Sequence, residues 1–165
     1  HMSKLPESMF WMARGLEEAL EDGIKNWASG TERRTKWLND DPDSWHVIAG
    51  TMLIGCYSYA ESKLGTRWWG KMKSDAARRD LDIHWIVRNA VVHKDSVPKD
   101  LNSINDKKLA KLEDYCNNLK EGKIFDDKGN PYPCHMSFES DRIILNKNAI
   151  SLTARVFETA FRSFK

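Results

Sequence analysis

The sequence predicts an all-α protein, a bundle of five helices with a small β-hairpin before the last helix. Apolar residues recur every three or four positions over most of the chain, which is the period of a helix buried on one face. Strand-like patterns are confined to two short runs near the C-terminus, and no repeat occurs. The length of 165 residues fits one domain, which we expect to span residues 3–165.

The first two predicted helices are long. Residues 9–27 place apolar side chains on one face and four acidic residues, between positions 17 and 22, on the other. A Pro-Asp-Ser segment at residues 42–44 is a helix start signal, and the same apolar period continues from there to Leu64 with few charges. We therefore expect the second helix to be more deeply buried than the first.

The third predicted helix carries an apolar stripe from Leu81 to Val91. It should end shortly after His93, because Pro98 disfavours helical backbone in the residue before it. The later predicted elements are a helix over 105–119, a loop over 126–133, strands over 136–138 and 142–145, and a last helix over 150–164.

The charge balance, the cysteines and the lengths of the apolar runs limit the classes of protein to which the chain can belong. The 26 basic and 24 acidic residues give a net charge of +2, which neither requires nor excludes a nucleic-acid partner. The three cysteines form no CxxC pair, so the sequence supports neither a disulfide framework nor a thiolate zinc site. No apolar run has the length of a membrane span and no secretory signal is visible, so we expect a cytoplasmic protein without a membrane partner. His1 and Met2 have the pattern of a purification-tag remnant.

Common catalytic motifs are missing. The sequence contains no GxGxxG, GxxxxGK[ST], HExxH, GxSxG or EF-hand pattern. Asp80, Asp82 and His84 alternate along the third predicted helix, where residues two apart point about 200° away from each other. We interpret these three residues as a solvated helix start rather than a metal site, and we expect no metal and no cofactor.

A basic and aromatic segment precedes the third helix. Its cations and large aromatic residues are Arg67, Trp68, Trp69, Lys71, Lys73, Arg78 and Arg79. This mixture suits phosphate contacts and base stacking on single-stranded RNA. Alternatively, the tryptophans fill the top of the bundle while the cations stay in water.

A polar run interrupts the end of the third helix at Arg88, Asn89 and His93. Asn89 and His93 lie one turn apart and share a face, whereas Arg88 lies about 140° from His93 and reaches that face through its long side chain. The C-terminal end of a helix favours an imidazolium, and a guanidinium is a planar donor for phosphate oxygens. A cation, an amide and an imidazole can together cleave a phosphodiester without a metal.

This R-x4-H run, with Asn after Arg and on the third helix of a small bundle, resembles the HEPN superfamily. The order of elements is also similar, with two long antiparallel helices first and a hairpin before the last helix. The resemblance implies a metal-independent endoribonuclease of the kind found as toxins or antiviral defence effectors. Arg88 would hold the scissile phosphate, Asn89 would orient the phosphate or His93, and His93 would transfer protons during attack by the 2′-OH. The products would be 2′,3′-cyclic phosphate and 5′-OH ends.

The resemblance also implies partners. Family members bring two motifs together across a two-fold axis, which implies a homodimer through the helix that carries Arg88 and His93. An antitoxin or other regulatory protein is a further implied partner. Toxins silenced by a nucleotidyltransferase carry a tyrosine two residues after the histidine, where this chain has Asp95, so we do not expect that control. The alternative is a non-catalytic dimeric module that binds RNA, a nucleotide or a protein.

Overall fold

The computed structural model describes residues 5–164. The proposed tag remnant at His1 and Met2 and the two ends of the expected domain, residues 3 and 165, lie outside this range. The described elements are α1 (Glu7–Ala28), α2 (Glu32–Asp40), α3 (Pro42–Leu64), α4 (Asp75–His93), α5 (Asp106–Lys120), β1 (Met136–Glu139), β2 (Arg142–Leu145) and α6 (Asn148–Ser163). Short 3₁₀ turns cover Trp68–Lys71 and Pro98–Asp100. The prediction of an all-α bundle with a small antiparallel hairpin is confirmed.

The predicted number of helices is wrong, because residues 5–164 contain six α-helices and not five. The additional helix is α2, whose only apolar residues are Trp37 and Leu38, so it has no apolar stripe with a helical period. Its start carries a local signal instead. The Thr31 hydroxyl accepts a hydrogen bond from the Arg34 backbone N–H at 3.2 Å, which caps the first turn.

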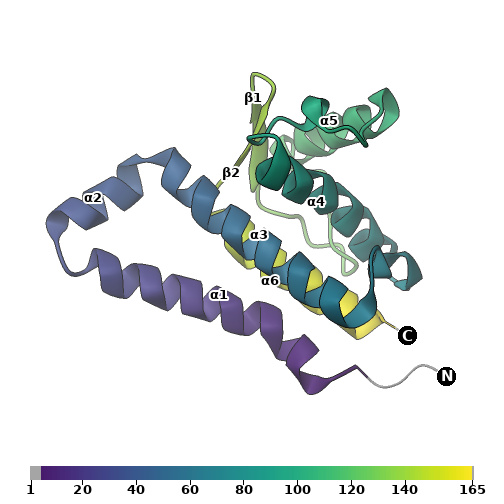
Figure 1. Cartoon of the computed structure of the whole chain (residues 1–165), viewed down its shortest axis with the longest axis horizontal. Helices are drawn as coiled ribbons and strands as arrows, with labels where there is room; N and C mark the ends of the chain where they lie inside the picture. The colour runs from purple at the N-terminus through teal and green to yellow at the C-terminus, as the bar shows by residue number, and fades with distance from the viewer. Residues whose placement is uncertain (1–4, 165) are drawn as a thin grey trace.

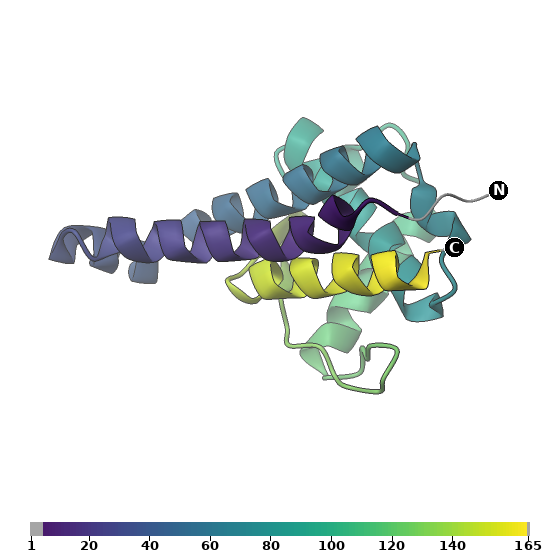
Figure 2. The same cartoon turned by 90° about the horizontal axis from the view of Figure 1, so that it is seen from below.

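The long helices α1 and α3 run antiparallel and are joined through α2 (Figure 1). Helix α6 packs along α1 and also contacts α3 and α4, while α5 and the hairpin lie on the other side of α4. The end of α1, the whole of α2 and the start of α3 project beyond the rest of the molecule (Figure 2). The bundle is therefore compact at one end and narrow at the other.

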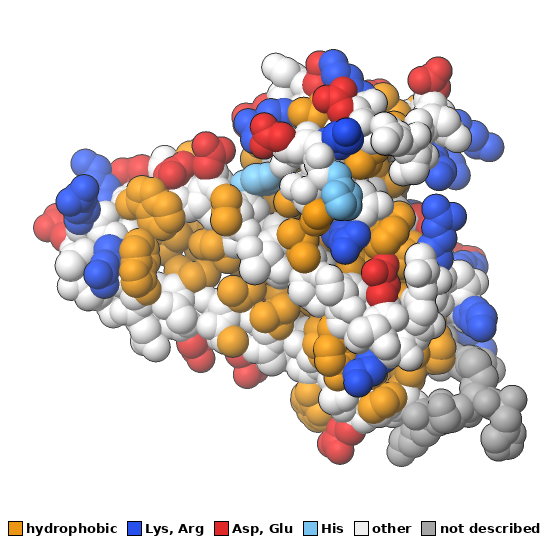
Figure 3. Space-filling model, in the orientation of Figure 1, with side chains coloured by type: hydrophobic (Ala, Val, Ile, Leu, Met, Phe, Trp, Pro, Cys, Tyr) orange, Lys and Arg blue, Asp and Glu red, His pale blue; other side chains and the backbone are white. Residues whose placement is uncertain are grey.

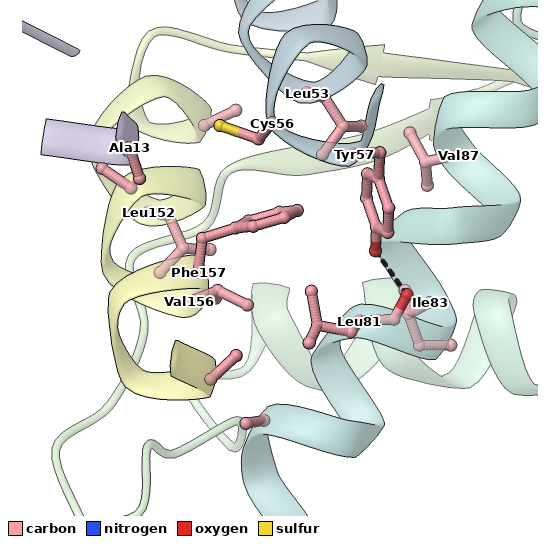
Figure 4. Packing of buried hydrophobic residues seen from close by; sticks show 14 of the residues in the cluster. Ala13, Leu53, Cys56, Tyr57, Leu81, Ile83, Val87, Leu152, Val156 and Phe157 are labelled. Carbon is pink, nitrogen blue, oxygen red and sulfur yellow. Dashed lines mark hydrogen bonds between the residues drawn. The ribbon is translucent and has the colours of Figure 1, made fainter. Parts of the chain in front are cut away.

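The core is centred on Tyr57 of α3, which is fully buried. Its ring lies 5.0 Å from the ring of Phe157 and 5.6 Å from those of Trp69 and Trp85. Its hydroxyl donates a 2.5 Å hydrogen bond to the backbone carbonyl of Leu81 in α4 (Figure 4). Tyr57 therefore joins α3, α4 and α6 through one side chain.

The hairpin is also part of the core. Its strands pair Met136 with Leu145 and Glu139 with Arg142 around a tight turn. Met136, Ile143 and Leu145 are buried, β1 contacts α5, and β2 contacts α3. The two strands thus close the side of the bundle on which α4 ends.

We expect Tyr57→Phe to lower the free energy of unfolding by about 1–3 kcal/mol, because a buried carbonyl loses its hydroxyl donor. Tyr59→Phe is the matched control, since the Tyr59 hydroxyl bonds the Ser8 hydroxyl at an exposed position. The control should cost at most about 0.5 kcal/mol. Urea denaturation of the three proteins measures both values, and equal losses in the two variants would contradict this account of the core.

Candidate active site

Helix α4 has one buried and one open face. Its start is capped by the Ser74 hydroxyl, which accepts a hydrogen bond from the Ala77 N–H at 3.2 Å. Leu81, Val87 and Ala90 face the core and are fully buried. The other face is covered with side chains that are only partly buried or are exposed, and it includes the polar run of the R-x4-H motif.

Arg88 is half-buried and held by two neighbours on its own helix. Its guanidinium carbon lies 5.1 Å from the centroid of the Trp85 ring, and its Nη1 donates a 2.8 Å hydrogen bond to Oδ1 of Asn89. Its Nε is buried and has no hydrogen-bond partner among residues 5–164, and the guanidinium makes no ion pair within that range. Arg88 is thus positioned while its charge stays unneutralised. Asn89 contacts Arg88 rather than His93, a contact that the sequence did not predict.

His93 is the last residue of α4, which therefore ends slightly earlier than the sequence predicts, and it is exposed. It makes no hydrogen bond or ion pair with the part of the chain that the structure describes. Histidine, basic and hydrophobic side chains gather over α3 and α4 on one face of the molecule (Figure 3). His93 is therefore available to a ligand that approaches the open face of α4.

The turn after α4 is fixed from two sides. Asp95 and Ser96 adopt left-handed backbone conformations, with φ of 47° and 65°, and the Ser96 N–H returns to the Ala90 carbonyl at 2.9 Å. The Ser96 carbonyl accepts a 2.8 Å hydrogen bond from the Ile143 N–H of β2. The end of the motif helix is therefore attached to the hairpin.

His46 of α3 completes this attachment. Its Nδ1 accepts a hydrogen bond from the Leu145 N–H at 3.0 Å, so its Nε2 carries the proton and donates to the Ser96 hydroxyl at 2.9 Å. Burial and the nearby Arg142 lower the pKa of His46 and keep it neutral. Sequence reasoning missed His46, since its two partners lie 50 and 99 residues away along the chain.

The interpretation of Asp80, Asp82 and His84 as a solvated helix start is wrong for two of the three. Asp80 and His84 are buried, whereas Asp82 is exposed and accepts a 2.6 Å hydrogen bond from the Trp69 indole. Asp80 accepts hydrogen bonds from the hydroxyls of Tyr115 at 3.0 Å and Tyr132 at 2.5 Å, and it pairs with Arg79 at 2.9 Å. These contacts satisfy the carboxylate, which is why it can be buried.

His84 occupies the same buried face. Its Nδ1–H donates to the Asp80 carbonyl at 2.5 Å, and its ring stacks on that of His135 with the two Nε2 atoms 3.1 Å apart. Burial lowers the pKa of both histidines. Within residues 5–164, no group of three or more His, Cys, Asp or Glu side chains is arranged to hold a metal ion.

The basic and aromatic segment divides into core and surface residues. Trp68 and Trp69 are buried, and the Trp68 ring stacks on Phe161 at 5.3 Å. Their rings are packed among core aromatics and leave no open face for a base, so the predicted stacking role of both tryptophans needs correction. The structure agrees with the alternative that they fill the top of the bundle.

The cations of this segment also differ from one another. Arg78 donates a hydrogen bond to the Met72 carbonyl and pairs with Asp75. Arg79 pairs with Asp80 and donates to the Phe125 carbonyl. Both arginines are therefore bound to other parts of the fold. The side chains of Arg67, Lys71 and Lys73 are exposed. That they contact RNA is still a prediction.

An apolar surface lies beside the motif. Val47 of α3 is 64% exposed and Val92 of α4 is 42% exposed. Helices α3 and α4 approach closely at Gly50, where an added Cβ would lie 3.3 Å from Cγ1 of Val91. The open face of α3 and α4 therefore combines exposed valines with Arg88 and His93.

The chain matches no protein-family model, no curated protein and no solved structure. Among residues 5–164, no helix combines the length and the apolar character needed to cross a membrane.

We expect the protein to lose stability as the pH falls below about 6.5, the ordinary pKa of histidine. The pKa values of His46, His84 and His135 are lowered in the folded state, so the unfolded chain binds more protons below that pH. Each histidine then removes up to about 1.4 kcal/mol per pH unit until its folded-state pKa is reached. Thermal unfolding between pH 8 and pH 5 measures this loss. An unchanged melting temperature down to pH 5.5 would contradict the lowered pKa values of these three histidines.

Proposed function

We propose that this protein is a metal-independent endoribonuclease of HEPN type that acts as a toxin or antiviral defence effector. The observation that carries the proposal is the pair formed by Arg88 and the exposed His93 five residues later. Trp85 and Asn89 hold Arg88, and it has no acidic partner within residues 5–164. A positioned, unneutralised guanidinium and an accessible imidazole on the same helix are the groups that phosphodiester cleavage by the substrate's own 2′-OH requires.

Each group has a defined task in this reaction. The 2′-oxygen forms a bond to phosphorus and gives up its proton to the neutral imidazole of His93. The bond to the 5′-oxygen then breaks, and that oxygen receives the proton from the imidazolium so formed. Arg88 donates hydrogen bonds to the phosphate oxygens, on which negative charge increases in the transition state. Asn89 fixes the direction of Arg88 through its side-chain carbonyl. The ends produced are a 2′,3′-cyclic phosphate and a 5′-hydroxyl.

The assignment to the HEPN type rests on the order of elements. The antiparallel pair α1 and α3 comes first, the R-x4-H motif ends α4, and the hairpin precedes α6. These features support the resemblance of the sequence to that superfamily, together with the polar residue directly after the arginine.

The geometry of α4 favours a homodimer. Five residues separate Arg88 and His93 by a rise of about 7.5 Å and a rotation of about 140°, so one chain presents the pair poorly to a single phosphate. A two-fold axis at the open face would place the arginine of one protomer beside the histidine of the other. Val47 and Val92 supply exposed apolar area for such an interface on the same two helices.

The alternative function is a non-catalytic dimeric module that binds RNA, a nucleotide or a protein. The exposed valines support it, because they would serve a binding interface whether or not cleavage occurs. The accessible His93 favours the enzyme, since a module that only binds needs no titratable group at this position.

We expect the purified protein to cleave single-stranded RNA in the presence of EDTA and to leave DNA of the same sequence intact, because DNA lacks the 2′-OH. Arg88→Ala and His93→Ala should each lower the cleavage rate at least about a hundredfold. Gel analysis of end-labelled RNA measures the rates and identifies the cyclic phosphate ends.

Arg162→Ala is the matched control, since Arg162 is exposed and, among the residues that the structure describes, pairs with Glu158 alone on its own helix. The control should retain full activity, and His93→Ala should retain the melting temperature of the wild type. Loss of cleavage in EDTA with recovery in Mg²⁺ would overturn the mechanism, as would full activity in either motif variant.

We expect a mixture of Arg88→Ala and His93→Ala chains, combined after the dimers are dissociated, to recover part of the activity. Mixed dimers contain one composite site with an intact arginine from one chain and an intact histidine from the other. Cleavage assays on the mixture and on each variant alone measure the recovery. A fully active monomer in sedimentation at the assay concentration would contradict the shared site.

A further inference from the structure

The projecting end of the molecule exposes two aromatic rings. We name residues 25–37, from the last turn of α1 to the middle of α2, the arm tip. Trp27 and Trp37 at this tip are 44% and 47% exposed, and their rings meet edge to face with centroids 5.5 Å apart. The rest of the bundle does not reach this end, so about half of each ring's surface stays open (Figure 2).

The arm tip is also strongly basic. It contains Lys25, Arg33, Arg34 and Lys36 but only one acidic residue, Glu32, and all four cations are exposed. Arg34 lies 5.1 Å from the Trp27 ring centroid and donates to the Trp27 carbonyl at 3.4 Å. Within residues 5–164 none of the four makes an ion pair with a carboxylate. Basic side chains border hydrophobic ones at this end in Figure 3.

We propose that the arm tip is a binding site for single-stranded nucleic acid, in which Trp27 and Trp37 stack on bases and the four cations contact phosphates. Exposed indoles offer flat surfaces to unpaired bases, and unneutralised cations beside them complement a polyanion. An apolar protein partner would suit the two rings but would also have to cover four charges. A duplex would suit the charges but would leave the rings without exposed base faces.

The arm tip is separate from the proposed active site. Binding at the arm tip requires neither Arg88 nor His93, and it concerns other residues than the basic and aromatic segment whose tryptophans are buried. If the cleavage reaction also holds, the arm tip captures the substrate strand.

The first test measures fluorescence anisotropy of a labelled single-stranded DNA oligonucleotide, which binds without being cleaved because it has no 2′-OH. Trp27→Ala and Trp37→Ala should each weaken binding about tenfold, the usual scale for one stacked base. Trp11→Ala is the matched control, because Trp11 is 64% exposed on α1 but lies outside the arm tip. This control should bind as the wild type does.

The second test removes charge and leaves both rings in place. The triple variant Arg33→Ala, Arg34→Ala, Lys36→Ala should reduce the slope of log K against log salt concentration by about 2, because each phosphate contact on a single strand contributes about 0.7. The matched control removes three exposed cations of α5, Lys107, Lys111 and Lys120, and should leave the slope unchanged. Circular dichroism confirms that each variant is folded.

Equal weakening by tip and control variants would overturn the proposal, because it would indicate a non-specific charge effect. Tip variants that change the sedimentation behaviour but not DNA binding would also overturn it and would indicate a protein interface. Failure of this proposal and failure of the nuclease proposal are distinguishable. If DNA binds through the arm tip but RNA is not cleaved, only the nuclease proposal is refuted. If RNA is cleaved but the arm-tip variants bind DNA as the wild type does, only the arm-tip proposal is refuted.

Discussion

The position of α4 depends on the burial of Asp80. A carboxylate without exposed surface must have its hydrogen-bonding capacity filled, and Asp80 meets this requirement with two tyrosine hydroxyls and the guanidinium of Arg79. Tyr115 belongs to α5 and Tyr132 to the loop before β1, so the carboxylate connects three separate parts of the chain. Together with the Tyr57 bond to the Leu81 carbonyl on the next residue, these contacts fix the rotation of α4 about its axis. That rotation determines which residues reach the open face.

Arg79 and Arg88 show that two arginines on the same helix can have different roles. Arg79 is paired with a buried carboxylate and bonds the Phe125 carbonyl, so its charge is used within the fold. Arg88, nine residues later, rests on the Trp85 ring and bonds a neutral amide. A ring and an amide orient a guanidinium without cancelling its charge. The charge of Arg88 therefore stays unneutralised at the open face, while Arg79 contributes to stability.

Local patterns predicted the parts of the structure that depend on neighbouring residues. The apolar period located five helices because each buries one stripe against the bundle, and it missed α2 because that helix buries only Leu38. The polar run of Arg88, Asn89 and His93 was visible because all three residues lie on two turns of one helix. The hydrogen bond between Arg88 and Asn89 was not expected, since neighbouring side chains on a helix point in different directions and only the length of arginine allows it.

Contacts between distant segments were beyond prediction from one sequence. The two tyrosine partners of Asp80 lie 35 and 52 residues away, and nothing in the local pattern distinguishes a buried aspartate from one in a solvated first turn. The same limit applies to tryptophan, which is compatible both with a core and with a base-stacking surface. The packing of the whole bundle decided that Trp68 and Trp69 are inside and that Trp27 and Trp37 are outside.

The fixed turn after α4 has a consequence for the conformational entropy of the histidine that precedes it. The last residue of a helix ordinarily frays, and its backbone then samples many conformations. Here the hydrogen bonds of Ser96 with Ala90, Ile143 and His46 hold the backbone just beyond His93. The backbone entropy is therefore lost when the protein folds and not when a ligand arrives. What remains free is rotation about the two side-chain torsions of His93, so the imidazole can change its direction while the Cα atom stays in place.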